Sequence, residues 1–414
     1  MTDREELDGQ IGPYRLLSIL GEGGFGTVWL AERREPFVQR VALKVIKAGM
    51  DSRQVIARFE QERQALAVID HPNVAKVFDA GTTEQGRPYF VMEHVAGESI
   101  TTHCDRRRLT LRARLELFLP VCEAIQHAHH KGILHRDLKP SNILVAEQNG
   151  RAIPKVIDFG VAKAMSQALT DKTLFTEQGQ ILGTPEYMSP EQASPGLLDV
   201  DTRTDVYSLG VVLYELLTGL LPFDPQDLRR AGQMEIQRII REVDPPTPSR
   251  RVTALEESTA GALAALRQVD RRDLRRQLHR ELEWLPLMAM RKDRERRYRT
   301  PTDLADDIRN YMAGRPLLAG PESKSYLLRK FLRRYRTTVA VTASFVALLM
   351  TGTWLTWSQS QSNAKLAIEE SSSRRAAVEA ATLADTRAKE AQRQSYVANI
   401  AAADAALHAG DLDN

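Results

Sequence analysis

The sequence predicts an α+β fold in which a strand-rich lobe is followed by a helix-rich lobe and then by one apolar helix. Three observations carry this prediction. Residues 14–95 contain short β-branched and apolar runs, residues 96–313 carry apolar residues at helical spacing, and residues 338–357 are uncharged and apolar. We expect the following order of segments: a leader at 1–13, a two-lobed domain at 14–313 (lobes 14–95 and 96–313), a basic segment at 314–337, the apolar helix at 338–357 and a helical segment at 358–414.

Composition narrows the class of protein. A chain of 414 residues exceeds what one hydrophobic core usually serves, so more than one domain is expected. The net charge of +3 is too small to predict a nucleic-acid partner. Two cysteines, Cys104 and Cys122, fit a reducing cytoplasm better than a disulfide framework, and Cys122 fits a helix core. Met1–Gln10 is acidic and polar, so we expect no cleaved signal peptide.

The first lobe should consist mostly of strands. Val28–Ala31, Val41–Ile46 and Pro88–Val95 are apolar or β-branched runs of strand length. Asp51–Ile69 has apolar residues at near-helical spacing and predicts one helix between the strands.

The second lobe should be mainly helical. A long helix is predicted by the apolar face of Leu115, Phe118, Leu119, Cys122 and Ile125. Short strands are expected at Ile143–Val145 and Lys155–Ile157, and an irregular, threonine-containing loop at Met165–Gly183. Asp205–Leu217 reads as a strongly apolar helix that ends at Thr218-Gly219.

Residues 224–282 are rich in arginine. Pro245, Pro246 and Pro248 exclude one long helix there, whereas Ala260–Leu282 is expected to be helical. The arginines fit either a solvated charged face or a docking surface, and the sequence does not decide between them.

A glycine-rich segment is the first sign of phosphate handling. It reads Gly21-Glu-Gly23-Gly-Phe-Gly26-Thr-Val28. Glycines let backbone N–H groups approach phosphate oxygens without a Cβ in the way. The same spacing opens dinucleotide-binding helices, but here a strand pattern follows and no helix begins.

Lys44 is the second sign, because it lies inside the apolar strand Val41-Ala42-Leu43-Lys44. A buried lysine is costly unless it is paired, and a phosphate with a carboxylate would offset that cost. Glu62 is the expected carboxylate; Glu60 lies roughly 200° around the same helix and cannot face the same way. The alternative is that Lys44 is a solvated edge residue.

Two further motifs complete the set. The first is His135-Arg136-Asp137-Leu138-Lys139-Pro140-Ser141-Asn142, and the second is Asp158-Phe159-Gly160. Asp137 could orient an attacking hydroxyl, Lys139 could reach the transferring phosphate, and Asn142 with Asp158 offers the hard oxygens that Mg²⁺ prefers.

Together, in this order, these motifs resemble the bacterial eukaryotic-like (Hanks-type) membrane-bound serine/threonine protein kinases. The resemblance implies the two-lobed protein kinase fold and transfer of the ATP γ-phosphate to Ser or Thr hydroxyls of protein substrates, with Mg²⁺ or Mn²⁺ as metal. It implies catalytic roles for Lys44, Glu62, Asp137 and Lys139, and metal ligation by Asn142 and Asp158. The ATP-binding residues that it implies are Leu20, Gly21, Glu22, Gly23, Gly24, Phe25, Gly26, Thr27, Val28, Ala42, Lys44, Met92, Glu93 and Val95.

The resemblance also implies supporting and regulatory residues. Arg297 is expected to pair with Glu191, and Asp205 is expected to have a structural role. Lys139, two residues after Asp137, resembles the serine/threonine pattern. Arg136 beside Asp137 would need an anion, which phosphorylation of the activation loop could supply; the candidate residues are Thr170, Thr173 and Thr176. A homodimer for autophosphorylation is a corresponding expectation.

Three other positions are expected around the site. Thr184 should contact the catalytic loop, Met92 should gate the back of the adenine pocket, and Glu93–Val95 should form the hinge that binds adenine through its backbone. Met92 is equally compatible with plain core packing. A metal site among His127, His129, His130 and His135 lacks a completing carboxylate or cysteine, so we do not expect one.

Thr338–Trp357 predicts a membrane span. Its 20 residues correspond to roughly 30 Å of helix, with Trp354 and Trp357 at one end. A basic cluster at the other end places the kinase in the cytoplasm and residues 358–414 outside, in a single-pass cell-membrane protein; it consists of Arg329, Lys330, Arg333, Arg334 and Arg336. The alternative is a buried helix of a soluble domain.

The final segment and the class of activity each leave alternatives. Residues 359–414 could begin a longer sensor domain or form a helical stalk that mediates dimerisation.

The domain at 14–313 has two alternative interpretations: a catalytically dead receptor and a small-molecule kinase of similar fold. Every catalytic position is filled, which argues against a catalytically dead receptor. The long segment that ends at Ser189-Pro190-Glu191 favours a protein substrate over a small molecule. The substrates and the external signal are not predicted.

Overall fold

The computed structural model describes residues 9–23, 26–46, 68–159, 184–194, 200–321 and 323–410, apart from the side chains of 233 and 407–410. The chain divides into two compact units, Met1–Lys330 and Phe331–Asn414. The predicted loop at Met165–Gly183 and almost all of the predicted helix at Asp51–Ile69 lie outside the described residues.

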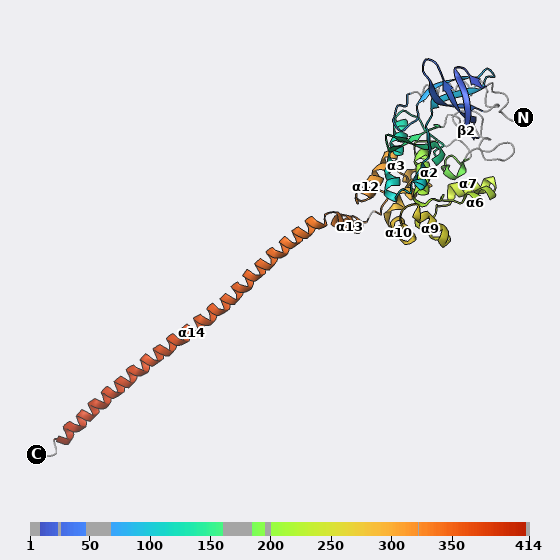
Figure 1. The fold of residues 1–414 in the computed structure, drawn as a ribbon. Coiled ribbons are helices and arrows are strands. Elements are labelled where there is room, and N and C mark those ends of the chain that lie inside the picture. The colour runs from blue at the N-terminus through green and yellow to red at the C-terminus, as the bar shows by residue number, and fades with distance from the viewer. Residues whose placement is uncertain are drawn as a thin grey trace. The chain divides into compact units, whose positions relative to one another are not determined.

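Six strands form the antiparallel sheet of the first lobe (Figure 1). The order is β1-β2-β3-β4-β6-β5, and the bounds are β1 Gln10–Ile11, β2 Tyr14–Gly23, β3 Gly26–Arg33, β4 Gln39–Ile46, β5 Val77–Thr82 and β6 Pro88–Glu93. Successive side chains alternate between the two faces of a strand. Val41, Leu43 and Val45 of β4 therefore join one core cluster, whereas Lys44 belongs to the opposite face.

A smaller sheet belongs to the second lobe. It has the order β7-β8-β9, with β7 at Gly97–Ser99, β8 at Ile143–Gln148 and β9 at Arg151–Val156. Val74 forms an isolated parallel bridge with Val156 of β9. The Ala75 N–H donates to the Val156 carbonyl at 2.9 Å, so the segment before β5 is tied to the second lobe by backbone hydrogen bonds.

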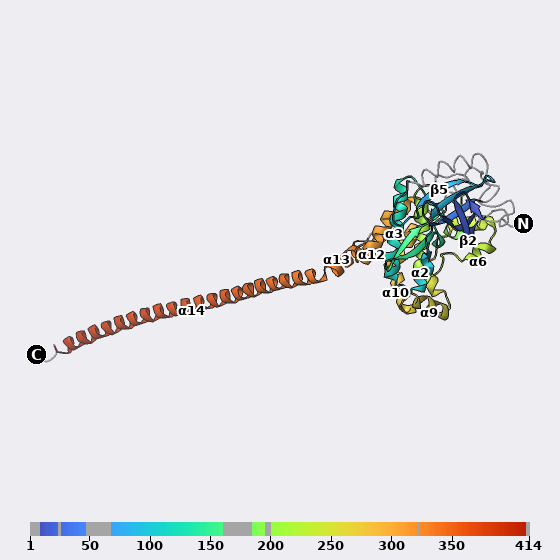
Figure 2. The ribbon, with the colours of Figure 1, turned by 45° about the horizontal axis from the view of Figure 1, so that its top comes forward.

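Helices make up most of the second lobe, as the sequence predicts. Their bounds are α2 Ile100–Arg106, α3 Leu111–His130, η1 Pro140–Asn142, η2 Pro185–Tyr187, α5 Arg203–Thr218, α6 Pro225–Arg230, α7 Gln233–Glu242, α8 Pro248–Thr253, α9 Glu257–Ala265, α10 Arg271–Gln277, η3 Leu278–Leu282, α11 Trp284–Ala289, η4 Arg294–Arg296, α12 Pro301–Met312 and α13 Lys324–Arg334. Figure 1 and Figure 2 both show α3 and α12 close together.

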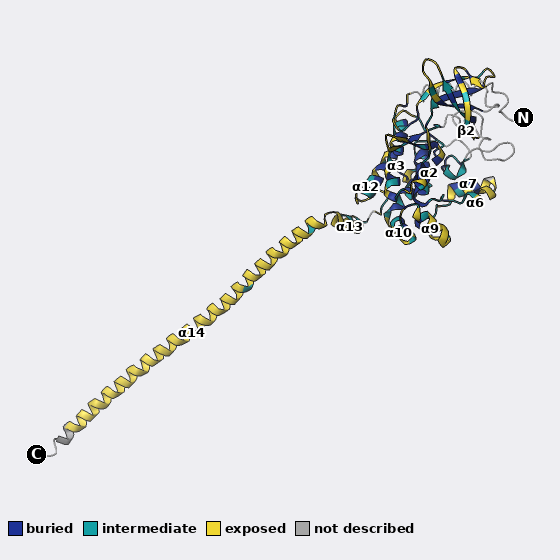
Figure 3. Cartoon of the chain, viewed as in Figure 1, coloured by how far each residue is buried: buried dark blue, intermediate teal, exposed yellow. Residues whose placement is uncertain are grey.

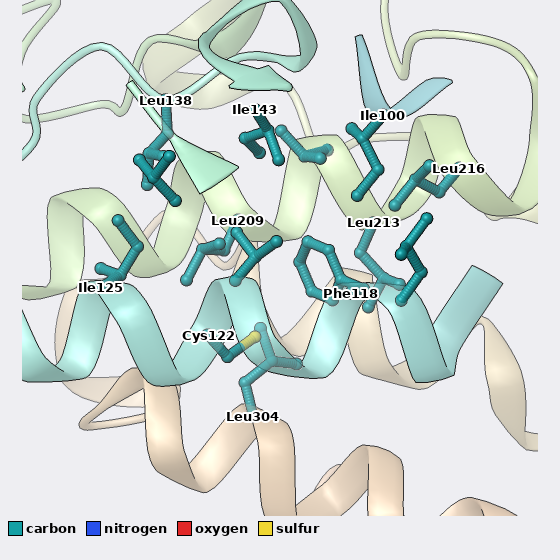
Figure 4. Close-up of a cluster of buried hydrophobic side chains, with 14 of the residues drawn as sticks. Ile100, Phe118, Cys122, Ile125, Leu138, Ile143, Leu209, Leu213, Leu216 and Leu304 are labelled. Atoms are coloured by element: carbon teal, nitrogen blue, oxygen red, sulfur yellow. The ribbon is translucent and has the colours of Figure 1, made fainter. Parts of the chain in front are cut away.

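The core of this lobe lies between α3, α5 and α12 (Figure 4). Phe118, Cys122 and Ile125 of the predicted apolar face are fully buried there, against Leu209 of α5 and Leu304 of α12. Because burial of a large apolar side chain contributes about 1.5–3 kcal/mol, this seam fixes the helices that carry the loops described below.

Helix α5 ends where the sequence predicts, at Gly219, which has φ +79°. Two fully buried arginines donate hydrogen bonds to its last carbonyl groups. Arg114 donates to Leu216 O at 3.2 Å, and Arg267 donates to Leu217 O at 2.5 Å. These cations satisfy backbone groups that a helix end leaves without intrahelical partners.

The section Ala260–Leu282 is largely helical, as expected, but it is divided into separate helices. Helix α9 ends at Ala265, and α10 begins only at Arg271, followed directly by η3. Gln268 between them has φ +58°, a left-handed conformation that stops a helix. Asp270 then caps α10 by accepting a hydrogen bond from the Asp273 N–H at 2.7 Å.

Most of the second unit is helix α14, which covers Arg336–Gly410. Among the described residues, Arg336–Ala406 is the one helix long and apolar enough, over part of its length, to cross a membrane. Its described side chains are almost all exposed, including the apolar ones of Thr338–Trp357 (Figure 3).

Candidate active site

The loop between α3 and η1 is held in place by Asp205. This carboxylate belongs to the first turn of α5 and is fully buried. Its two oxygens accept hydrogen bonds from the backbone N–H groups of His135 and Arg136, each at 2.8 Å. Arg136 has φ +64°, a costly conformation for a non-glycine residue, which these bonds stabilise.

His129 adds a third contact to the same carboxylate, at 2.7 Å. Burial by itself raises the pKa of Asp205, but the hydrogen bonds from His129 and from the backbone of His135 outweigh it, so its pKa is lowered. Asp205 is therefore a buried anion that organises the loop backbone. The structural role predicted for it agrees with this geometry; the contribution of His129 gave no signal in the sequence.

His135 is fully buried and uses both ring nitrogens. Nε2 lies 3.0 Å from Ile157 O, and Nδ1 accepts from the Asp137 N–H at 3.3 Å. The ring also contacts that of Phe159, with centroids 4.8 Å apart. Burial lowers the pKa of His135, and the contacts fit a neutral ring that donates from Nε2.

Asp137 lies at the centre of three side chains of the predicted site. Lys139 Nζ is 3.0 Å from Asp137 Oδ2 and 3.3 Å from Thr184 Oγ1. The Asn142 amide nitrogen donates to Asp137 O at 2.8 Å. The structure thus brings Asp137, Lys139 and Asn142 together, and the predicted contact between Thr184 and this loop is present.

Lys44 and Asp158 form the second half of the site. Lys44 Nζ lies 2.5 and 2.6 Å from the two oxygens of Asp158. The lysine is 9% exposed, so the alternative of a solvated edge residue is wrong. Asp158 has φ +59°, which turns the chain after β9. Glu62, the predicted partner of Lys44, lies outside the described residues.

A pocket adjoins this ion pair. Met92 of β6 lies at its wall, in the place expected for a gating residue. Apart from Lys44 and Asp158, the lining residues that the structure describes are apolar: Ile46, Ile69, Val74, Ala75, Val77, Phe90, Met92 and Phe159. Largely apolar walls with two charged groups are typical of sites for small organic ligands.

The described residues of the glycine-rich segment belong to the end of β2 and the start of β3. Glu22 pairs with Thr27, and Gly21 with Val28. A Cβ on Gly26 would lie 2.1 Å from Val45 O of β4, so only glycine fits there. Gly24 and Phe25 lie outside the described residues. Of the other predicted nucleotide contacts, Ala42 is paired with Met92 across the sheet, and Leu20 is 48% exposed.

The predicted hinge contains an ion pair that the sequence did not indicate. Glu93 accepts hydrogen bonds from Lys155 Nζ at 2.7 and 2.8 Å, which links β6 of the first lobe to β9 of the second. Its carboxylate also accepts from the Lys76 N–H at 3.3 Å. Its backbone N–H donates to Lys76 O at 2.8 Å, so Glu93 can offer at most its carbonyl group to a ligand. Val95 is buried beside Ala146.

Glu191 and Arg297 form the ion pair predicted for them. Arg297 donates from both terminal nitrogens to the Glu191 oxygens, at 2.7 and 2.8 Å, and both side chains are nearly fully buried. Thr204 of α5 donates to the same carboxylate at 2.8 Å. Burial raises the pKa of Glu191, but Arg297 more than compensates, so the pKa is lowered.

The predicted metal ligands fit a hard divalent cation. Asp158 offers carboxylate oxygens, and Asn142 directs its amide nitrogen toward Asp137, which leaves its amide oxygen for another partner. Mg²⁺ needs only one or two protein oxygens when phosphate oxygens and water complete its shell. No group of three or more histidine, cysteine or acidic residues suited to a metal occurs within the part of the chain that the structure describes. The regulatory candidates Thr170, Thr173 and Thr176 lie outside that part.

Comparisons with known proteins agree with this geometry. A family model described as protein kinase domain matches residues 14–297. The serine/threonine-protein kinase pkn3 of Myxococcus xanthus is 36% identical over 286 residues, which cover 68% of this chain and 51% of the relative. PknB of Mycobacterium leprae is 34% identical over 73% of this chain and 43% of its own length. PrkC of Bacillus subtilis is 36% identical over 58% and 34%.

Solved structures show the same fold. The kinase domain of Mycobacterium tuberculosis PknI matches with a TM-score of 0.51 and 24% identity, over 73% of this chain and 98% of that structure. The predicted two-lobed fold and the resemblance noted in the sequence are therefore confirmed. The chain spans about a third to a half of the length of the curated relatives named here.

Proposed function

Because this chain belongs to the protein kinase domain family, we propose that it transfers the γ-phosphate of ATP to serine and threonine hydroxyls of protein substrates. The observation that carries the proposal is the arrangement of Asp137, Lys139 and Asn142 in one loop, together with the Lys44–Asp158 pair. Kinases of this family use ATP and a divalent metal.

The proposed chemistry needs positioning and charge stabilisation rather than a covalent intermediate. Asp137 accepts the hydrogen bond of the substrate hydroxyl and orients its oxygen in line with the γ-phosphorus. As the new P–O bond forms, the bond to the bridging oxygen of ADP breaks, and Asp137 accepts the hydroxyl proton. Lys139 donates to the transferring phosphoryl oxygens, and Lys44 donates to the phosphates of the nucleotide.

Mg²⁺ is the metal we propose, held by Asn142 and Asp158, where it would neutralise charge on the β- and γ-phosphates. Lys44 offsets the negative charge of Asp158 in the structure. We propose that nucleotide binding divides this pair, so that Lys44 turns to phosphate and, as the resemblance implies, to Glu62.

The preference for serine and threonine rests on Lys139. Its ammonium group lies between Asp137 and Thr184, next to the place where a substrate hydroxyl must bind. We also propose that phosphorylation at Thr170, Thr173 or Thr176 supplies an anion to Arg136 and so activates the enzyme.

We propose a single membrane span at residues 338–357, with the kinase domain on the cytoplasmic side. The apolar run within α14 and the basic residues that precede it support this arrangement. The test is extraction of membranes with alkaline carbonate. A spanning chain stays in the pellet, and release into the supernatant would contradict the span.

The activity is tested with purified chain, radiolabelled ATP and a general protein substrate. Wild type should incorporate label on serine and threonine, as phosphoamino-acid analysis reads out. Asp137→Asn should lower the rate by a factor of about 10²–10⁴, the usual contribution of a positioned acid–base group. Equal incorporation by Asp137→Asn, or label on tyrosine alone, would refute the proposal.

A further inference from the structure

The segment that follows α12 folds back onto the kinase lobe. The backbone N–H groups of Leu318 and Ala319 donate to the two oxygens of Asp307, at 2.7 and 2.9 Å. Asp307 is 1% exposed and also accepts from the Tyr298 hydroxyl at 2.8 Å. This buried carboxylate therefore ties the chain after the domain to the base of the lobe.

Helix α13 continues this attachment. The Tyr326 ring meets the Trp284 ring edge-on at 5.7 Å, and the Tyr326 oxygen accepts from the Leu317 N–H at 3.3 Å. Lys330 Nζ lies 2.6 Å from Glu281 of η3, and the two side chains are only 12% and 19% exposed. Lys330 is thus fixed beside the segment formed by α10 and η3.

The attachment limits how far this segment can lie from the proposed membrane span. The apolar run begins at Thr338, eight positions after Lys330. These eight positions reach at most about 28 Å when fully extended, and about 12 Å when helical. If residues 338–357 span the bilayer, Glu281 and the residues around it are held close to the membrane surface.

The segment held in this way is strongly basic. Residues 271–280 contain five arginines and one acidic residue. Arg272, Arg275 and Arg280 are exposed, and none of the three forms an ion pair with any residue that the structure describes. We call these three the α10 basic surface. Residues 324–336, which follow in the chain, carry six cations and no acid.

We propose that the α10 basic surface binds the anionic phospholipid headgroups of the membrane in which the chain is anchored. The proposal rests on the membrane span proposed above and assigns a role to the arginine-rich segment. Charge complementarity and chain continuity favour lipid over an acidic protein partner. The arginines have no ion-pair partner among the described residues, and the segment that carries them is tethered a short distance from the proposed span.

Binding of the α10 basic surface to lipid would hold the kinase lobe at a defined distance from the membrane, whereas a flexible tether would let that distance vary. Each arginine near an anionic surface multiplies the surface-bound population by about five, so three give a factor on the order of 100. The attraction should weaken with salt, because the Debye length falls from about 10 Å at 0.1 M to about 3 Å at 1 M.

The experiment uses the full chain in nanodiscs of phosphatidylcholine, with or without phosphatidylglycerol. A fluorophore on His279→Cys, between the arginines, reports contact with a quencher attached to lipid headgroups. The native thiols do not compete for the label, because Cys104 and Cys122 are fully buried and burial raises the pKa of Cys104 to about 11. A label on Glu84→Cys, in the turn before β6, is the reference position.

Quenching at 279 should be strong in anionic nanodiscs, weak in neutral ones and reduced at high salt, with little change at 84. The triple variant Arg272→Gln/Arg275→Gln/Arg280→Gln should lower the anionic signal to the neutral level. The matched triple Arg230→Gln/Arg241→Gln/Arg299→Gln removes the same charge from other exposed positions and should keep the signal.

Each other result overturns the proposal. Equal quenching in neutral and anionic nanodiscs would do so, as would an equal loss in both triple variants. Full quenching in the α10 triple variant would show that these arginines do not bind lipid, and an acidic protein would then be the remaining candidate ligand of the α10 basic surface. A chain that does not co-elute with nanodiscs would refute the span itself, and with it this inference, while the phosphorylation assay still tests the kinase activity separately.

Discussion

In the candidate site, the packing around a single residue determines its hydrogen bonds and its protonation state. His135 lies in the motif that predicts catalysis, but it touches backbone rather than substrate groups: Ile157 O on one side and the Asp137 N–H on the other. Its neutral ring therefore positions Asp137. Asp205 does the same for the two backbone N–H groups before Asp137. Asp205 keeps its buried charge because it accepts several hydrogen bonds, whereas the buried ring of His135 stays neutral.

The protonation of His135 predicts a pH dependence of stability. Its pKa is below the ordinary 6.5 in the folded protein, so the unfolded chain binds more protons. The free energy of unfolding should thus be intact above pH 6.5 and fall as the pH drops below it, by up to about 1.4 kcal/mol per unit from this group. Urea unfolding of the solubilised chain, followed by tryptophan fluorescence between pH 7.5 and 5.5, measures it.

His135→Asn lacks the titrating ring and serves as the control for this prediction. It should unfold more easily at pH 7.5 but lose less stability on acidification than wild type. Parallel pH profiles for the two proteins would contradict the assignment.

At the scale of elements, the second lobe depends on close contact between helices. Gly210 of α5 faces α11, where a Cβ would lie 2.6 Å from Ala289 Cβ and 3.2 Å from Pro286 O. Glycine weakens a helix by about 1 kcal/mol relative to alanine, so its presence in a buried helix indicates that packing decided the residue.

Gly210→Val should lower the free energy of unfolding by at least about 2 kcal/mol, because three added carbons have no space between α5 and α11. Gly261→Val in α9 is the matched control, since nothing lies within 4 Å of its Cβ position. It should be close to neutral. Denaturant titration of both variants tests the contact, and equal losses would show that propensity rather than packing is responsible.

The attachment of α13 belongs to the same scale. Glu281→Gln leaves the nearly buried Lys330 without its counter-charge, so α13 should detach more often. Trypsin should then cleave after Lys324 or Arg329 several-fold faster, as mass spectrometry of the early fragments reads out. Glu257→Gln removes a carboxylate whose side chain is 92% exposed and should leave the cleavage rate unchanged.

At the scale of the whole kinase unit, contacts between the lobes set the geometry of the nucleotide site. The Glu93–Lys155 pair joins β6 to β9, and the backbone around Val74 pairs with Val156. Both contacts lie next to the hinge proposed to bind adenine. They favour one orientation of the two lobes, which reduces the conformational cost of binding a nucleotide.

Lys155→Met should therefore raise the KM for ATP on the order of fivefold, with a smaller effect on kcat, because it frees the hinge without touching the reacting groups. Lys76→Met is the control: its partner Asp70 is exposed, and the pair lies at the surface. An unchanged KM for Lys155→Met, measured under the same conditions, would contradict the proposed role of the hinge pair.

The sequence by itself determined that a strand-rich lobe precedes a helix-rich lobe and where α5 ends, and it predicted the residues of the candidate site. It could do so because local spacing carries helix and strand periodicity, and because phosphate chemistry requires particular residue types close together in the chain. Asp137, Lys139 and Asn142 lie within six residues, so their proximity hardly depends on the fold.

Only the tertiary structure decided the contacts between distant segments. His129 with Asp205, Glu93 with Lys155, Arg267 at the end of α5 and Lys330 with Glu281 join residues far apart in the chain. In each contact, the packing of the fold determines which partner a charged or polar side chain meets. A single glutamate or lysine looks the same in a sequence whether or not it has such a partner. The break at Gln268 has the same origin, since it brings Arg267 to the carbonyls of α5.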